Sequence, residues 1–102
     1  MRTITIGVKH PGRPWVLWNV EDSLRTYRKI VGGMIEHFER SESGIEFFCN
    51  EEGKLLGLAP NVFSLRNQDM ICGPIFAVRA DEEGEFTSLT NEDIADLLAL
   101  SK

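Results

Sequence analysis

Residues 45–49 read Ile-Glu-Phe-Phe-Cys, and this stretch decides the fold class. Side chains alternate across a strand, so Ile45, Phe47 and Cys49 share one face and Phe48 lies on the other. Apolar groups on both faces are typical of a strand in a central position. Turn sequences flank the stretch at 41–44 and 50–53, with Gly53 expected to supply a positive φ. The chain therefore enters and leaves this strand through turns, as in an antiparallel sheet.

The N-terminal segment predicts a hairpin. Three aliphatic residues alternate with small or polar ones and indicate a half-buried strand: Ile4, Ile6 and Val8. Residues 15–18, Trp-Val-Leu-Trp, predict a second strand with its two tryptophans on opposite faces. Two prolines and a glycine in residues 10–14 favour a turn between the two strands.

Two helices are expected. The first begins at Asn19 or Asp22 and ends at the glycine pair 32–33. Its apolar face consists of Leu24, Tyr27, Ile30 and Val31. The second begins at Thr90, where Asp93 completes a capping box. Its apolar stripe consists of Ile94, Leu97 and Leu98.

The remaining segments complete an α+β fold. Residues 34–38 predict a third strand, 54–57 a short strand or a returning segment, and 73–78 with 85–89 a last hairpin. Residues 58–69 are irregular, with at most one helical turn. We expect a mainly antiparallel sheet of hairpins with two principal helices packed on it, covering one face. Residues 1–102 form a single domain.

Composition places the chain among soluble proteins of the cytoplasm. Of its 102 residues, 42% are apolar and 26% charged, and no apolar run approaches the roughly 20 residues of a membrane helix. Cys49 and Cys72 both lie in apolar stretches, which favours buried thiols in a reducing compartment. A buried disulfide between them is the alternative.

The charge of -5 is unevenly distributed along the chain. Residues 1–68 carry nine basic and eight acidic groups, whereas residues 69–102 carry two basic and eight acidic groups. Such an acidic field repels phosphate backbones, so nucleic acid is disfavoured as a partner.

The sequence contains no recognisable pattern of catalytic, metal-binding or phosphate-binding residues. Cys49 and His37 could meet across neighbouring strands, but Cys49 belongs to an apolar face and is expected to be a buried structural thiol. The histidines and cysteines lack the short spacing of zinc ligands, and the acidic run 81–85 lacks the pattern of a calcium loop. The glycine pair 32–33 follows a helix, unlike a phosphate loop. We therefore predict no catalytic residue, no metal and no cofactor.

Three segments together resemble the DUF3846 family of small uncharacterised bacterial and phage proteins. They are 30–36 (Ile-Val-Gly-Gly-Met-Ile-Glu), 49–61 (from Cys-Asn-Glu-Glu-Gly-Lys to Ala-Pro-Asn) and 71–74 (Ile-Cys-Gly-Pro). The resemblance covers nearly the whole chain and implies an accessory gene of phages or other mobile elements, with no activity to carry over. Where Met34 stands, the family usually has an aromatic or aliphatic residue.

Seven residues form the candidate ligand or partner surface. They are Glu36, Asn50, Glu51, Glu52 and Asn61, in or near residues 50–58, the most specific part of the resemblance, and the tryptophans Trp15 and Trp18. Tryptophan is enriched at interaction hot spots, although packing in the core under the helices is the favoured explanation of the pair. Asn50 and Asn61 also have turn and capping duties that would brace the backbone.

Three functions remain to be compared. The leading one is a non-enzymatic binding or regulatory module that contacts another protein, or a second copy of itself, through a strand edge or an aromatic patch. The alternative is a small hydrolase or nucleotide-handling enzyme that uses carboxylates near Glu36 and Glu51. The third is an acidic mimic of DNA formed by the C-terminal part of the chain.

Overall fold

A computed structural model describes residues 1–100 and contains eight strands and two helices within that range. In chain order these are β1 (Thr3–Lys9), β2 (Val16–Glu21), α1 (Leu24–Val31), β3 (Ile35–Arg40), β4 (Ile45–Asn50), β5 (Pro60–Ser64), β6 (Asp69–Cys72), β7 (Ile75–Ala80), β8 (Phe86–Thr87) and α2 (Asn91–Ala99). Every strand pair is antiparallel. The predicted α+β class is confirmed.

The main sheet has the strand order β2-β1-β7-β4-β3, with β8 paired to the end of β7. The central strand is β7, and four consecutive side chains in it are completely buried: Ile75, Phe76, Ala77 and Val78. The strand predicted from residues 45–49 is β4, which lies between β7 and β3 as an interior strand should. Strands β5 and β6 form a separate hairpin.

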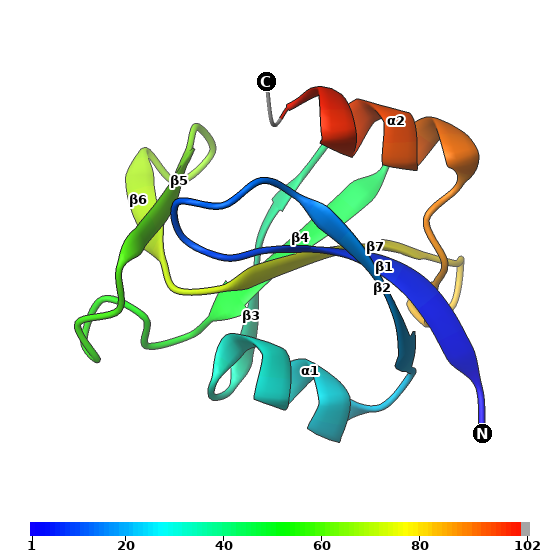
Figure 1. Cartoon of the computed structure of the whole chain (residues 1–102), viewed down its shortest axis with the longest axis horizontal. Helices are drawn as coiled ribbons and strands as arrows, with labels where there is room; N and C mark the ends of the chain where they lie inside the picture. The colour runs from blue at the N-terminus through cyan, green and yellow to red at the C-terminus, as the bar shows by residue number, and fades with distance from the viewer. Residues whose placement is uncertain (101–102) are drawn as a thin grey trace.

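The helices lie on opposite faces of the sheet, so the expectation that only one face is covered was wrong (Figure 1). Because neighbouring side chains in β7 point to opposite faces, Phe76 and Val78 pack with Tyr27 of α1, whereas Ile75 and Ala77 pack with Leu97 of α2. A sheet whose inner strands are apolar on both sides needs a cover on each side. We call the two sides the α1 side and the α2 side.

The β5–β6 hairpin corrects the prediction of an irregular segment at 58–69. Val62 and Ile71 are cross-strand partners that pack against the core on the α2 side, while Phe63 and Met70 pair on the outer surface. The register shifts between Pro60 and Val62, which interrupts the alternation that would identify a strand. Residues 51–57 are a series of turns, so of the two expectations for 54–57, a short strand or a returning segment, the strand was wrong.

The capping residues in the sequence predicted the end of α1 and the start of α2 correctly, but not the start of α1. Gly32 adopts a φ of 83° at the end of α1, and Thr90 and Asp93 form the predicted capping box of α2. The start of α1 was placed wrongly, because the side chain of Ser23 caps it and Asn19 belongs to β2. Asp22 instead accepts a hydrogen bond from the hydroxyl of Tyr27 at 2.6 Å.

The glycine at position 53 has a different role from the one predicted. It is absent from the positive-φ positions, whereas Gly57 has a φ of 70°. A Cβ atom on Gly53 would lie 2.3 Å from the carbonyl oxygen of Cys72. Gly53 is therefore required by the close approach of two backbone segments. Within residues 1–100, no helix has the length and apolar character needed to cross a membrane.

Candidate functional site

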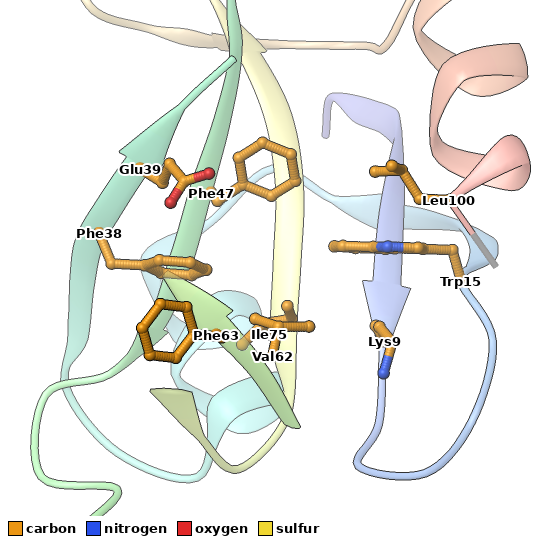
Figure 2. Close-up of a pocket in the computed structure, with 9 residues that line it drawn as sticks. All are labelled: Lys9, Trp15, Phe38, Glu39, Phe47, Val62, Phe63, Ile75 and Leu100. Atoms are coloured by element: carbon orange, nitrogen blue, oxygen red, sulfur yellow. The ribbon is translucent and has the colours of Figure 1, made fainter. Parts of the chain in front are cut away.

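A pocket with a volume of about 270 Å³ opens on the α2 side, between the sheet, the β5–β6 hairpin and the end of α2 (Figure 2). Its floor consists of core side chains, so the pocket is a gap in the cover of the hydrophobic core. The lining residues are Lys9, Trp15, Phe38, Glu39, Phe47, Val62, Phe63, Ile75 and Leu100. Two of them carry charge, and we call this the Lys9–Glu39 pocket.

Lys9 reaches the pocket because of the alternation in β1. Val8 points into the core on the α1 side, so Lys9 points to the α2 side. Its ammonium group donates to Oδ1 of Asn61 at 2.7 Å, and Asn61 Nδ2 donates to the carbonyl oxygens of Lys9 and Gly73 at 2.9 and 2.8 Å. Burial lowers the pKa of Lys9 below its ordinary value. Asn61 therefore fixes both the backbone and the ammonium group of Lys9.

Glu39 reaches the pocket because of a β-bulge in β3. His37 pairs with Phe48 and Glu39 pairs with Phe47, which leaves Phe38 as the extra residue. Simple alternation would separate Phe38 and Glu39, but with the bulge both side chains face the α2 side and line the pocket. Bulges of this kind are over-represented beside functional sites, where they re-aim a side chain.

A buried hydroxyl holds the Glu39 carboxylate in position. The side chain of Ser64, which is 0% exposed, donates to Glu39 Oε1 at 2.9 Å. Asn67 Nδ2 in turn donates to Ser64 Oγ at 3.0 Å and to the carbonyl oxygen of Phe38 at 2.7 Å. These bonds also fasten the tip of the β5–β6 hairpin to β3.

The two charged groups lie too far apart to neutralise each other. Strands β1 and β3 are separated by β7 and β4, and three strand spacings amount to roughly 14 Å. Figure 2 shows Lys9 and Glu39 on opposite sides of the apolar side chains. Among residues 1–100, no carboxylate forms an ion pair with Lys9. The pocket therefore has an apolar middle, a positively charged group on one side and a negatively charged group on the other.

Three predicted residues, Glu36, Asn50 and Glu51, meet in a second and smaller hollow of about 170 Å³. Both polar atoms of the Asn50 amide hold the backbone, since Nδ2 donates to the carbonyl oxygen of Val31 at 3.1 Å and Oδ1 accepts from the backbone amide of Glu52 at 2.7 Å. Neither Glu52 nor Asn61 lines this hollow. The hollow thus combines a structural asparagine, Asn50, with the carboxylates of Glu36 and Glu51.

The thiol of Cys49 and the ring of His37 lie on opposite faces of the sheet. Glu36 is the cross-strand partner of Cys49, and His37 is paired with Phe48. The ring of His37 bonds to Glu46 Oε1 at 2.7 Å. Burial, together with the charge of Glu36, raises the pKa of Cys49 to about 11. Cys49 and Cys72 are both free thiols, and no thiol–imidazole pair forms.

The two tryptophans have separate environments. Trp15 is 5% exposed and packs against Phe47, with 5.8 Å between the ring centroids. Trp18 is 39% exposed on the α1 side, with the ring of His10 at 5.9 Å. Their placement on opposite faces confirms the prediction. Trp15 belongs to the core and the pocket wall, so Trp18 alone is presented at the surface.

Trp18 belongs to an edge strand with an open side. No strand pairs with the outer side of β2 within the part of the chain that the structure describes. Val16, Leu17 and Trp18 are 41%, 39% and 39% exposed, and the strand contains no proline, lysine or bulge. The opposite edge, β3, carries a bulge and four polar or charged side chains, which are common protections against strand pairing.

Sequence reasoning missed Lys9, Glu39 and Ser64. The alternation in residues 3–9 would have placed Lys9 on the face opposite Val8, which was an available signal. For Glu39 and Ser64 there was none, because a bulge and a hairpin packed across strands decide their directions.

Comparison with known proteins gives one match. The family described as Domain of unknown function (DUF3846) matches residues 4–102. No curated protein and no solved structure matches the chain.

Proposed function

We propose that this chain, which belongs to the DUF3846 family of domains of unknown function, is a protein-binding module that acts through the open edge of β2. The partner that the edge fits best is the β2 strand of a second copy. The observation that carries the proposal is the contrast between a protected edge at β3 and an unprotected, apolar edge at β2.

Strand addition explains why β2 lacks protection. An exposed edge offers a row of unpaired backbone donors and acceptors to another extended segment. In an antiparallel pairing centred on Leu17, each Val16 would face Trp18 of the second copy and the two Leu17 side chains would face each other. Apolar groups would then meet on both faces of the joint sheet, as a two-fold symmetric interface requires.

The test is the molar mass in solution. We expect a species of twice 11.5 kDa that dissociates on dilution through the micromolar range, measured by sedimentation equilibrium. Trp18→Lys places a charge at the centre of the edge and should give the monomer mass throughout. Leu55→Lys is the matched control, since Leu55 is 85% exposed in the turns away from β2, and it should leave the dimer intact. A wild-type monomer at every concentration would refute the proposal.

A phage or mobile-element setting stays a prediction that rests on the family resemblance. The check is the gene context of other members of the family. A role of this chain in chromosomal core metabolism would argue against that setting.

A second candidate function is supported by the hollow around Glu36 and Glu51. Two carboxylates at one polar hollow, with the ion pair of Lys54 and Asp69 beside them, are compatible with nucleotide or hydrolytic chemistry. Thermal shift with a panel of nucleotides, with and without Mg²⁺, tests this function. Stabilisation that disappears in the Glu36→Gln and Glu51→Gln variants would support it, and no stabilisation by any nucleotide would remove it.

A further inference from the structure

We infer that the Lys9–Glu39 pocket binds a small amphipathic carboxylate, an apolar chain or ring with a single carboxylate group that pairs with Lys9. This site is separate from the β2 edge, and its ligand class is not implied by any of the functions above. Three features of the pocket carry the inference: an ammonium group with no ion-pair partner among residues 1–100, a preformed apolar wall and a second charge of the opposite sign.

The ammonium group of Lys9 is positioned but not neutralised. An ammonium has three donors, and the contacts within residues 1–100 use one of them, on Asn61. Asn61 cannot turn away, because its amide also holds the carbonyl oxygens of Lys9 and Gly73. The lowered pKa of Lys9 shows that burial disfavours its charge. A carboxylate at the pocket mouth would accept a further hydrogen bond from the ammonium group and supply a counter-charge.

The wall of the pocket exists before any ligand arrives. Trp15, Phe38, Phe47 and Ile75 are 5%, 6%, 9% and 0% exposed and belong to the packed core. Such residues lose little conformational freedom on binding, which favours affinity. The volume of about 270 Å³ lies just below the roughly 300–1,000 Å³ typical of pockets for drug-sized molecules. A small apolar chain or one ring fits this space.

Glu39 restricts the ligand to a single negative charge. Its carboxylate is directed into the far side of the pocket by the bulge at Phe38 and is held there by Ser64. A second anionic group on the ligand would approach this carboxylate in a partly apolar environment, where repulsion is strong. Dicarboxylates of the same length should therefore bind more weakly than monocarboxylates.

The tryptophan fluorescence of the Trp18→Phe variant provides the test, because the tryptophan that remains is Trp15, which lines the pocket. Titration with octanoate should change the emission in a saturable way. The dicarboxylate octanedioate should bind at least about tenfold more weakly, because its second carboxylate meets the carboxylate of Glu39. The absence of a saturable change with octanoate, or equal affinities for octanoate and octanedioate, would overturn the inference.

Two variants separate the roles of the charges. Lys9→Met keeps most of the apolar stem and removes the charge, so it should weaken octanoate about tenfold or more while leaving 1-octanol unchanged. Unchanged octanoate affinity in a folded Lys9→Met variant would overturn the inference. If that variant does not fold, Glu39→Gln decides the matter. In the Glu39→Gln variant, the affinity for octanedioate should come closer to the affinity for octanoate. An unchanged ratio of the two affinities would refute the inference.

Discussion

Arg79 and Asp93 form a bidentate pair: Arg79 Nε donates to Asp93 Oδ2 at 2.9 Å and Arg79 Nη2 donates to Asp93 Oδ1 at 2.7 Å. Asp93 Oδ2 also accepts the backbone amide of Thr90 at 2.9 Å, which completes the capping box of α2. One buried carboxylate therefore both starts α2 and ties it to β7. The position of α2, which forms part of the cover beside the Lys9–Glu39 pocket, depends on this contact.

Replacing the carboxylate should loosen α2. Asp93→Asn leaves Arg79 facing an amide that cannot accept both of its hydrogen bonds, and we expect a loss of about 3 kcal/mol in the free energy of unfolding. The value lies at the low end for a buried pair because the Arg79 side chain is 29% exposed. Urea denaturation measures it. Asp96→Asn, at an exposed position of the same helix, is the control and should change stability little.

The same contact predicts a dependence of stability on pH. The hydrogen bonds from Arg79, followed by those from Thr90, lower the pKa of Asp93 below its value in the unfolded chain. A lowered pKa contributes stability that is present above the unfolded value of about 3.9 and is lost as the pH falls through the folded value. The wild type should therefore lose more stability than Asp93→Asn during acidification below about pH 4. Parallel pH profiles for the two proteins would contradict this.

Replacing Gly53 with a residue that has a side chain should destabilise the fold for a steric reason. A Cβ atom there would lie 2.3 Å from the carbonyl oxygen of Cys72, and a backbone oxygen in a paired strand cannot move aside. We expect Gly53→Ala to cost at least about 2 kcal/mol. Gly57→Ala is the control, with open space around its Cβ and a positive φ of 70°, and it should cost about 1 kcal/mol. Equal losses in the two variants would show that close approach is not the cause.

The two thiols should differ in reactivity. Burial and the charge of Glu36 raise the pKa of Cys49 to about 11, so it has almost no thiolate at pH 8. Cys72 is partly exposed, and a disulfide reagent should label it first in the folded protein. Peptide mass spectrometry of a quenched time course measures both rates. Glu36→Gln should speed the labelling of Cys49 only, and similar rates at the two cysteines in the wild type would contradict the buried placement.

Features set by neighbouring residues could be predicted from the sequence. The alternation in β1, the apolar faces of β4, the helix stop at Gly32 and the capping box at Thr90 depend on residues within a few positions of each other. These signals gave the α+β class and the interior position of β4. They also placed the two tryptophans on opposite faces.

Features set by distant contacts could not be predicted in the same way. The bulge at Phe38 and the register shift at Asn61 depend on how β3 and β5 meet their partner strands, and both determine which groups enter the Lys9–Glu39 pocket. Which helix covers which face of the sheet also depends on distant contacts, although the apolar groups on both faces of residues 45–49 already favoured two covers. The candidate surface therefore included Asn61 and Trp15 but not Lys9 or Glu39.

Asn61 contributes both to the stability of the fold and to the position of the Lys9 ammonium group, and the variant Asn61→Asp tests both contributions. The new carboxylate cannot donate to the carbonyl oxygens of Lys9 and Gly73, so we expect a loss of about 2 kcal/mol in the free energy of unfolding. It would also neutralise Lys9 from within the protein, and octanoate should then bind at least about tenfold more weakly. Asn19→Asp is the matched control, because Asn19 accepts from Thr5 through an oxygen that aspartate retains. If both variants unfold at the same urea concentration and bind octanoate equally, Asn61 does not hold Lys9 for a ligand.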